Sequence, residues 1–404
     1  MSEGRVILKP GKEKPVLRRH PWIFSGAIAR VRGATPGGIV TVTAHDGRFL
    51  ARGYYNPHSQ IRVRLLTWDE HEPIDAHFWY RRIAEAWQRR DEIVRGRTTA
   101  WRAIHGESDG LPGLIVDVYE RWLVLQVLTL GIERALEHIL PALVDVAHPA
   151  GIFERSDVDV RKQEGLSPRV GVLWGEPPLR RLSIREHDFT FLVDVWRGQK
   201  TGFYLDQREN RARVAPYAAG RRVLNAFSYT GAFAVYALSH GAIHVTNLDA
   251  SAEALHLAEE NLTLNGFGPD LWTNIRGDVF QGLREYRRAG HTFDMIILDP
   301  PKFATHRAAL PRATRGYKDI NLLAFRLLTP GGILVTFSCS GLIDPDLFQK
   351  IVFGASVDAG VEGQILAYLD QAPDHPVRLS FPEGRYLKGL VVRKLSSQEE
   401  KEVS

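Results

Sequence analysis

The chain has 404 residues, a net charge of +5 and one cysteine, and 44% of its residues are hydrophobic. This length allows two or three domains with a sizeable core. A single cysteine excludes an internal disulfide and a cysteine-based zinc cluster, and we expect no bound metal. The start of the chain carries no signal-peptide core, and no apolar run approaches the roughly 18 residues of a membrane-spanning helix. We therefore expect a cytoplasmic protein with no membrane partner.

The first predicted domain, residues 1–72, is a small β-barrel. Turn residues separate three short strand-like segments, 39–42, 49–51 and 61–65. Residues 1–70 hold 12 Lys or Arg and only 5 Asp or Glu, so the positive charge of the chain is concentrated here. Basic and aromatic residues interleave, which is typical of surfaces that neutralise phosphates and stack bases. A solvated arginine-rich face is the alternative. The residues expected to contact RNA here are Arg18, Arg19, Arg62 and Arg64.

The second predicted domain, residues 73–188, mixes helices and strands. A helix of about six turns is expected from Pro73, because apolar residues recur on one helical stripe. Strands are expected at 114–118, at 123–127 and near residue 152, with a second helix from about Glu133. This α+β region has no obviously catalytic residues.

The third predicted domain, residues 189–396, alternates strands with helices, and a tail follows at 397–404. Alternation of this kind predicts an α/β fold with a mostly parallel sheet that is covered on both faces. Ser251 is a good N-cap for a helix that Asn265 and Gly266 end. The expected strands are 223–227, 244–248, 273–276, 293–298 and 333–337, with a closing strand at 386–395.

The loop after the first of these strands predicts a nucleoside site. Gly231 would let the backbone approach a ligand, and Asp249, 18 residues further on, ends the second strand and could hold both ribose hydroxyls. Asp278 ends the third strand and is placed to meet an adenine amino group. The closely spaced glycines that cradle a pyrophosphate are absent, so we expect a nucleoside without phosphates, S-adenosylmethionine. Each acid taken alone could equally be an ordinary loop carboxylate.

Asp299 and Cys339 follow the fourth and fifth strands. Asp299 opens the segment DPPKF, in which two prolines fix the backbone and present the carboxylate rigidly. Cys339 could be a small buried hydrophobe, since free cysteine is usually inert. However, the carboxyl ends of neighbouring parallel strands meet at one edge of a sheet, so both residues should line one pocket.

This pair suits methylation at carbon 5 of a pyrimidine, which is too weakly nucleophilic until another group attacks carbon 6. Cys339 would make that attack, Asp299 would hydrogen-bond the ring nitrogen or the exocyclic amine, and Lys302 would help to keep the thiol ionised. A fixed thiol reaches carbon 6 only in an extruded or unpaired base, so we expect RNA as the partner.

Six segments carry a family resemblance: 17–26 (LRRHPWIFSG), 107–114 (ESDGLPGL), 200–208 (KTGFYLDQR), 228–231 (SYTG), 299–303 (DPPKF) and 337–340 (FSCS). With them the chain resembles, over nearly its whole length, the large-subunit ribosomal RNA 5-methylcytosine methyltransferases of the RlmI type. The resemblance implies an amino-terminal PUA domain, a class I (Rossmann-like) methyltransferase domain, and 23S ribosomal RNA, free or partly assembled, as the partner. It also implies Cys339 as the nucleophile and Asp299 as its partner. The expected cofactor contacts are Phe203, Asn225, Ser228, Tyr229, Gly231, Asp249, Asp278 and Asp299, with Lys302 on the RNA side.

Three other functions remain open from the sequence. A methyltransferase acting on an exocyclic guanine nitrogen shares similar segments but needs no cysteine. A catalytically silent RNA-binding assembly factor would keep the sheet as a scaffold and bind no S-adenosylmethionine. An NAD-dependent enzyme is disfavoured by the missing glycine pattern. A homodimer is also open.

Overall fold

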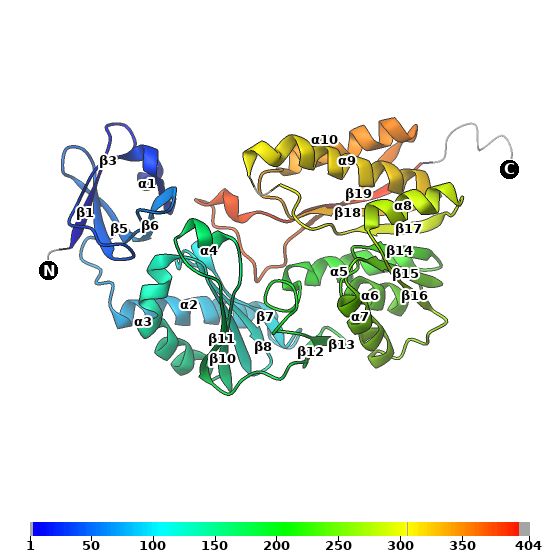
Figure 1. The fold of residues 1–404 in the computed structure, drawn as a ribbon, viewed down its shortest axis with the longest axis horizontal. Coiled ribbons are helices and arrows are strands. Elements are labelled where there is room, and N and C mark those ends of the chain that lie inside the picture. Colours follow the sequence, from blue (N-terminus) through cyan, green and yellow to red (C-terminus); the bar gives the residue numbers. More distant parts are fainter. Residues whose placement is uncertain (1–2, 305, 396–404) are drawn as a thin grey trace. The chain divides into compact units, whose positions relative to one another are not determined.

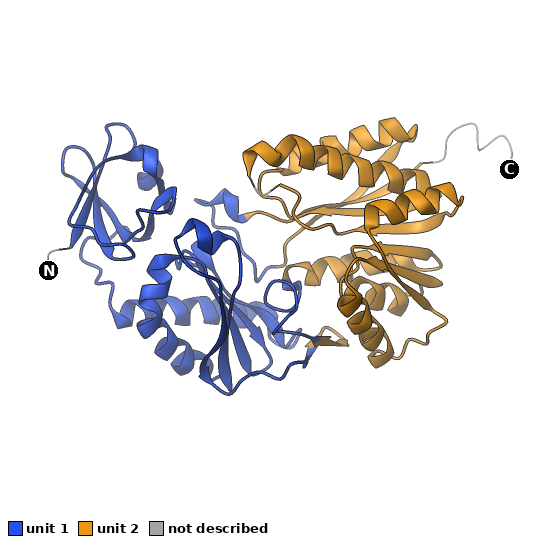
Figure 2. Cartoon of the chain, viewed as in Figure 1, with its two compact units in different colours: residues 1–184, 193–205, 373–384 blue, residues 185–192, 206–372, 385–404 orange. Residues whose placement is uncertain are grey.

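The computed structural model describes residues 3–304 and 306–395, so the expected tail 397–404 lies outside the described residues. The chain forms two compact units that exchange segments along the sequence (Figure 2). The first unit consists of residues 1–184, 193–205 and 373–384, and the second consists of residues 185–192, 206–372 and 385–404. The domain boundaries expected at residues 72 and 188 stay predictions.

The first unit begins with a six-stranded sheet that has its own core. Alternating burial along Ile39–Thr43 shows why this segment forms a strand: one face packs inward and the other faces outward. Three of the strands were expected from the sequence. The strands, in sheet order, are β2 (Trp22–Phe24), β6 (Ile61–Thr67), β5 (Phe49–Tyr55), β4 (Ile39–Thr43), β1 (Gly4–Leu8) and β3 (Ile28–Arg32), with helix α1 (Lys14–Leu17) beside them.

The first unit continues with a five-stranded sheet that packs with two long helices around a second core. The expected helix start at Pro73 is three residues early, because Asp75 caps the helix by accepting a hydrogen bond from the Phe78 N–H at 3.0 Å. The strands, in sheet order, are β11 (Arg169–Gly175), β10 (Gly151–Ser156), β9 (Trp122–Val127), β8 (Leu114–Tyr119) and β7 (Ala100–His105); the helices are α2 (Ala76–Val94), α3 (Leu130–Ala147) and α4 (Val160–Gln163). A separate hairpin pairs β12 (Leu182–Glu186) with β13 (Phe189–Val193).

The second unit is a seven-stranded sheet with helices on both faces (Figure 1). The strands β14 to β18 pair in parallel, as the alternation of strands and helices predicted. In sheet order the strands are β16 (Trp272–Arg276), β15 (His244–Asp249), β14 (Arg222–Ala226), β17 (Phe293–Leu298), β18 (Leu328–Ser338), β20 (Lys388–Lys394) and β19 (Gly363–Asp370). The helices are α5 (Arg208–Val214), α6 (Ala232–Ser239), α7 (Ala252–Leu264), α8 (Val279–Arg288), α9 (Leu310–Leu327) and α10 (Pro345–Ala359).

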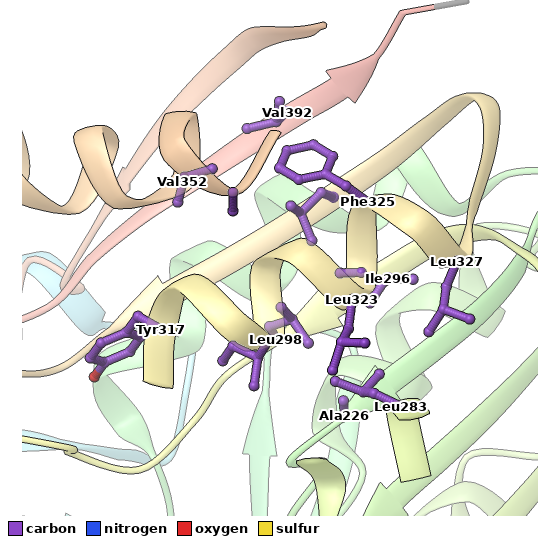
Figure 3. Packing of buried hydrophobic residues seen from close by; sticks show 14 of the residues in the cluster. Ala226, Leu283, Ile296, Leu298, Tyr317, Leu323, Phe325, Leu327, Val352 and Val392 are labelled. Carbon is purple, nitrogen blue, oxygen red and sulfur yellow. The ribbon is translucent and has the colours of Figure 1, made fainter. Parts of the chain in front are cut away.

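The main core of the second unit lies between this sheet and the helices α8, α9 and α10. Figure 3 shows side chains from these helices, among them Leu283 and Leu323, interlocking with sheet residues such as Ile296 and Leu298. The α7 boundaries are as predicted, since the Ser251 hydroxyl accepts a hydrogen bond from the Ala254 N–H at 3.1 Å. A dense core of this kind fixes the strand ends that carry the polar loops described below.

The last strands differ from the expectation. The segment expected to close the sheet, 386–395, forms β20, which lies between β18 and β19 and pairs antiparallel with both. The edge strand β19 was not predicted, because its half-exposed residues have no clear alternation. No helix within the described residues is long and apolar enough to cross a membrane.

Candidate active site

The loop that follows β14, residues 227–231, has an unusual backbone. Phe227, Tyr229 and Gly231 have φ values of 58°, 48° and 74°, in the left-handed region that residues other than glycine rarely adopt. At Gly231 a Cβ atom would also lie 2.8 Å from the Cβ of Ala258, so packing against α7 requires glycine there as well. Strain held in place by surrounding structure is typical of ligand sites.

Asp249, at the end of β15, fixes this loop. Its Oδ2 accepts a hydrogen bond from the Tyr229 N–H at 2.8 Å, and its Oδ1 accepts one from the Ser251 N–H at 2.9 Å. Because an ionised carboxylate has about four acceptor sites, each oxygen can still accept a hydroxyl of a ligand. The carboxylate is therefore held rigidly at the mouth of the loop.

Two hydroxyls of the same loop are suited to a polar ligand. Ser228 and Thr230 are buried, and their hydroxyl oxygens have no hydrogen-bond partner among the described residues. A buried polar group without a partner is costly, so such groups usually meet a water or a ligand. Together with the Asp249 carboxylate they offer the donors and acceptors that a nucleoside needs, and they fit S-adenosylmethionine.

The structure gives Asn225 and Asp278 local partners. Asn225 is buried and its Nδ2 donates to Oδ1 of Asn247 at 2.9 Å; Asn247 in turn donates to Asn274, so three amides form a ladder across β14, β15 and β16. The exposed Asp278 caps α8 by accepting from the Gln281 N–H at 2.9 Å. Both side chains thus make hydrogen bonds that stabilise the local structure. Their expected contact with the cofactor stays a prediction.

Phe203 belongs to the first unit, whereas the other expected cofactor residues belong to the second. Its backbone N–H donates to the Tyr119 hydroxyl at 3.1 Å, and the neighbouring Thr201 hydroxyl donates to Oδ2 of Asp117 at 2.7 Å. The loop that contains Phe203 is thus anchored to β8. Its role toward the cofactor stays a prediction.

Asp299 and Cys339 follow adjacent strands, and their loops meet. Asp299 comes directly after β17, and Cys339 directly after β18. The Cys339 thiol donates to the Pro300 carbonyl oxygen over 3.9 Å, and Cys339 is partly accessible to solvent. The thiol therefore lies beside the Asp-Pro-Pro segment, at the carboxyl end of the parallel sheet, where ligands bind in open α/β folds.

Tyr317 on α9 contacts the DPPKF segment through Phe303. Burial raises the pKa of its hydroxyl, and negative charge at Cys339 and at Asp299 raises it further. The ring of Phe303, the last residue of the DPPKF segment, packs on Tyr317 with 4.5 Å between ring centroids. This contact explains why the segment ends in an aromatic residue.

Lys388 is the residue that the sequence interpretation missed. It begins β20, pairs with Ser338 across the sheet, and is only 3% exposed. Its ammonium group donates to the carbonyl oxygens of Ser340 at 2.7 Å and of Ile343 at 2.5 Å, both in the turn after Cys339. The only signal in the sequence is a lysine at the start of an apolar strand, which does not reveal what the strand pairs with.

The expected RNA-contacting residues fall into two groups. Arg18, Arg19 and Lys302 are exposed and Arg62 is partly exposed. Arg64 is 5% exposed and forms an ion pair with Glu164 at 2.9 Å, so the geometry favours a structural role for Arg64 over contact with RNA.

A cleft of about 510 Å³ lies beside Arg18 in the first unit, and Lys14, His20 and Leu379 also line it. Nearby, the guanidinium groups of Arg19 and Arg378 both lie over the Trp68 ring, 5.3 and 5.7 Å from its centroid. Burial lowers the pKa of Arg378, and the positive charges of Arg82 and Arg19 lower it further. Clustered cations of this kind favour an anionic partner. Within the described residues, no group of three or more His, Cys, Asp or Glu could hold a metal ion.

Two family models match the chain, a PUA-like domain over residues 6–68 and an S-adenosylmethionine-dependent methyltransferase over residues 142–375. The fold and the loops at the carboxyl ends of β14, β15, β17 and β18 thus belong to an S-adenosylmethionine-dependent methyltransferase with a PUA-like domain.

Full-length relatives define the family more narrowly. The chain is 52% identical to the ribosomal RNA large subunit methyltransferase I of Aeromonas salmonicida over 390 residues, 96% of this chain and 98% of that protein. It is 50% identical to the protein of the same name from Shewanella frigidimarina over 392 residues, 96% and 99% of the two chains. The chain belongs to the ribosomal RNA large subunit methyltransferase I (RlmI) family.

Solved structures show the same fold at lower identity. A candidate SAM-dependent methyltransferase from Streptococcus mutans matches with a TM-score of 0.84 and 20% identity, covering 96% of this chain and 99% of that one. A candidate methyltransferase complexed with SAH matches with a TM-score of 0.85 and 21% identity, over the same shares of the two chains.

Proposed function

We propose that this protein methylates carbon 5 of a cytosine in large-subunit (23S) ribosomal RNA, through a transient bond between the Cys339 sulfur and carbon 6 of the base. The observation that carries the proposal is the position of the Cys339 thiol beside the Asp299-Pro300 loop at the carboxyl end of the sheet. The names of the relatives support ribosomal RNA as the substrate.

The thiol and the carboxyl group have separate tasks. Cys339, as the thiolate, adds to carbon 6, so that the electron pair of the 5,6 double bond becomes available at carbon 5. Asp299 hydrogen-bonds the ring nitrogen or the exocyclic amine and stabilises the charge that develops there. After methylation, loss of the carbon 5 proton to a base restores the double bond, and the thiolate leaves.

The cofactor loop 227–231 and Asp249 would hold S-adenosylmethionine, which supplies an electrophilic methyl group when it is bound. The two buried hydroxyls of Ser228 and Thr230 and the fixed Asp249 carboxylate support this assignment. The rigid backbone of the loop keeps these groups in place before the ligand arrives, which lowers the cost of binding.

The cationic surface of the first unit would bind the RNA backbone. Arg18, Arg19, Lys14 and Arg378 lie in or beside the cleft described above, and the residues that line the cleft include no carboxylate. Binding of this kind depends strongly on salt, because each phosphate contact releases counterions. A cytoplasmic location is part of this proposal, and a homodimer stays a prediction.

Trapping with a fluorinated base tests the covalent step. A 23S transcript made with 5-fluorocytidine and incubated with the protein and S-adenosylmethionine should form a complex that survives denaturing electrophoresis, because after methyl transfer a base cannot remove fluorine from carbon 5 as it removes a proton. Cys339 is the only cysteine in the chain, so peptide mapping should place the RNA on that residue.

The control is Cys339→Ser, which should form no complex and should lose methyl transfer by roughly three orders of magnitude or more, as expected when a nucleophile is removed. Calorimetry should show that this variant still binds S-adenosylmethionine. An active wild-type preparation that forms no complex, or a fully active Cys339→Ser, would contradict the proposal and favour a methyltransferase acting on an exocyclic guanine nitrogen.

A further inference from the structure

Lys388 is a buried cation whose close partners are uncharged. Its ammonium group lies 2.7 Å from the Ser340 carbonyl oxygen and 2.5 Å from the Ile343 carbonyl oxygen, and no carboxylate of the described residues lies within 4.0 Å of it. Burying a charge costs desolvation free energy unless the charge is paired or coordinated, and hydrogen bonds to two backbone carbonyl groups offset only part of that cost. The site therefore favours a negative charge close to Lys388.

Cys339 is placed to provide that charge. Lys388 pairs with Ser338, the residue before Cys339, and bonds the carbonyl of Ser340, the residue after it. Negative charge at Cys339 raises the pKa of Lys388, although burial is the larger effect and lowers that pKa to about 8. The interaction is reciprocal, so protonated Lys388 stabilises the Cys339 thiolate equally.

Other charges around Lys388 and Cys339 are weaker or less direct. Asp344 and Asp370 raise the pKa of Lys388 and Arg385 lowers it, but none of them forms an ion pair with it within 4.0 Å. Burial raises the pKa of the Tyr317 hydroxyl, and negative charge at Cys339 and Asp299 raises it further, so Tyr317 stays neutral at pH 7. Lys302, which the sequence suggested as the group that ionises the thiol, is exposed, and solvent screens its charge.

The same contacts hold the turn that carries the thiol. Besides the two bonds from Lys388, the Ser340 hydroxyl donates to the Ala304 carbonyl at 3.0 Å, and the Ser340 N–H donates to the Ser338 hydroxyl at 3.3 Å. Residues 338–343 are thereby tied to β20 on one side and to Ala304, the residue after the DPPKF segment, on the other. A nucleophile must be fixed to within a fraction of an ångström for its geometry to help catalysis.

We propose that Lys388 is a positioning residue of the methyl-transfer reaction: it fixes the turn after Cys339 and keeps the Cys339 thiol ionised at neutral pH. The proposal rests on the proposed function, in which Cys339 is the nucleophile. It assigns to a lysine of the antiparallel strand β20 the thiol activation that the sequence had attributed to Lys302.

The reactivity of the thiol tests the proposal without RNA or cofactor. Because Cys339 is the only cysteine, the rate of alkylation of the full chain by iodoacetamide, measured from pH 6 to pH 10, reports the pKa of this one thiol. In Lys388→Gln, which keeps a donor but loses the charge, the midpoint should rise by about one pH unit, so alkylation at pH 7 should slow about three- to fivefold. Lys388→Arg keeps the charge and should stay within about twofold of the wild type. Lys302→Gln is the matched control and should leave the midpoint unchanged.

Methyl transfer supplies a second signature. The deficit of Lys388→Gln should be about three- to fivefold at pH 7 and should shrink above about pH 9, because hydroxide then ionises the thiol without help. A purely structural defect would not be corrected by pH. A midpoint in Lys388→Gln equal to that of the wild type, or a deficit independent of pH, would overturn the proposal. Circular dichroism confirms folding, and Lys388→Met, which also removes the charge, carries the test if Lys388→Gln fails to fold.

The outcomes separate this inference from the proposed function. Suppose that Lys388→Gln shifts the thiol midpoint but the wild type forms no adduct with 5-fluorocytidine RNA. Lys388 would then affect the pKa of Cys339, but Cys339 would not be the nucleophile, and the proposal as stated would be overturned. An adduct with an unshifted midpoint would leave the proposed function intact and refute the role of Lys388.

Discussion

Arg102 in the first unit and Lys388 in the second are both buried cations, but they are neutralised in different ways. Arg102 on β7 forms two parallel bonds with the Asp117 carboxylate on β8, at 2.7 and 2.8 Å, and Asp117 is fully buried. Lys388 has two carbonyl oxygens instead of a carboxylate. A cation paired with its own carboxylate projects little field to its neighbours, whereas one held by weak dipoles can still act on a nearby thiol. The pair of Arg102 and Asp117 therefore stabilises the fold, whereas the charge of Lys388 can still change the pKa of a neighbouring group.

The largest effect that would sharpen this comparison is expected at Asp117. Asp117→Asn should lower the free energy of unfolding by about 3–5 kcal/mol, because it removes the buried carboxylate that forms two bonds with the Arg102 guanidinium. Urea denaturation followed by tryptophan fluorescence measures the change. Asp346→Asn, at an exposed carboxylate paired with Lys350, is the control and should leave the denaturation midpoint nearly unchanged. Equal midpoints for both variants would show that the buried pair is not structural.

A smaller effect is expected at Lys388. Lys388→Met should cost about 1–2 kcal/mol at pH 7, because two carbonyl groups lose a donor while the burden of a buried charge is relieved. The pH dependence has a definite sign. The pKa of Lys388 falls from 10.5 to about 8 in the folded protein, so the unfolded chain binds more protons between these values and wild-type stability rises with pH across this window. The Met variant lacks this contribution, so its difference from the wild type should widen from pH 8 to pH 10.5. A constant difference in denaturation experiments would contradict this.

The smallest effect is expected for exposed cations, which are neither paired with a buried carboxylate, as Arg102 is, nor held by buried carbonyl groups, as Lys388 is. Replacing Arg18 and Arg19 together by Gln should weaken RNA binding about tenfold and lower the slope of log affinity against log salt by about 1.4, or roughly 0.7 for each lost phosphate contact with a single strand. Stability should not change. Filter binding of a 23S fragment at several salt concentrations measures both quantities. The matched control is Arg30→Gln with Arg32→Gln on β3, which removes the same charge from the same unit at residues that do not line the cleft. An unchanged slope in the Arg18 and Arg19 variant would exclude these residues from the interface.

Much of the fold could be predicted because its signals are local. The helix after Ser251 begins and ends as predicted, because capping depends on the residues at each end. The parallel strands of the second unit were found from short apolar runs, whereas the edge strand β19 has no such run. Arg64 was expected to contact RNA, but it is buried and pairs with Glu164, which is distant in sequence, and no local pattern reveals a buried ion pair of this kind.

The sequence by itself determined the alternation of strands and helices in the second unit, the glycine of the cofactor loop and the placement of Asp249, Asp299 and Cys339 at strand ends. Such features follow from periodicity, turn chemistry and the rule that parallel strands end at one edge of a sheet. Only the tertiary structure decided which charge faces the thiol. The pairing of β18 with β20 brings Lys388 to Ser340 across 48 residues of sequence, and an antiparallel strand inserted into a parallel sheet has no local signature.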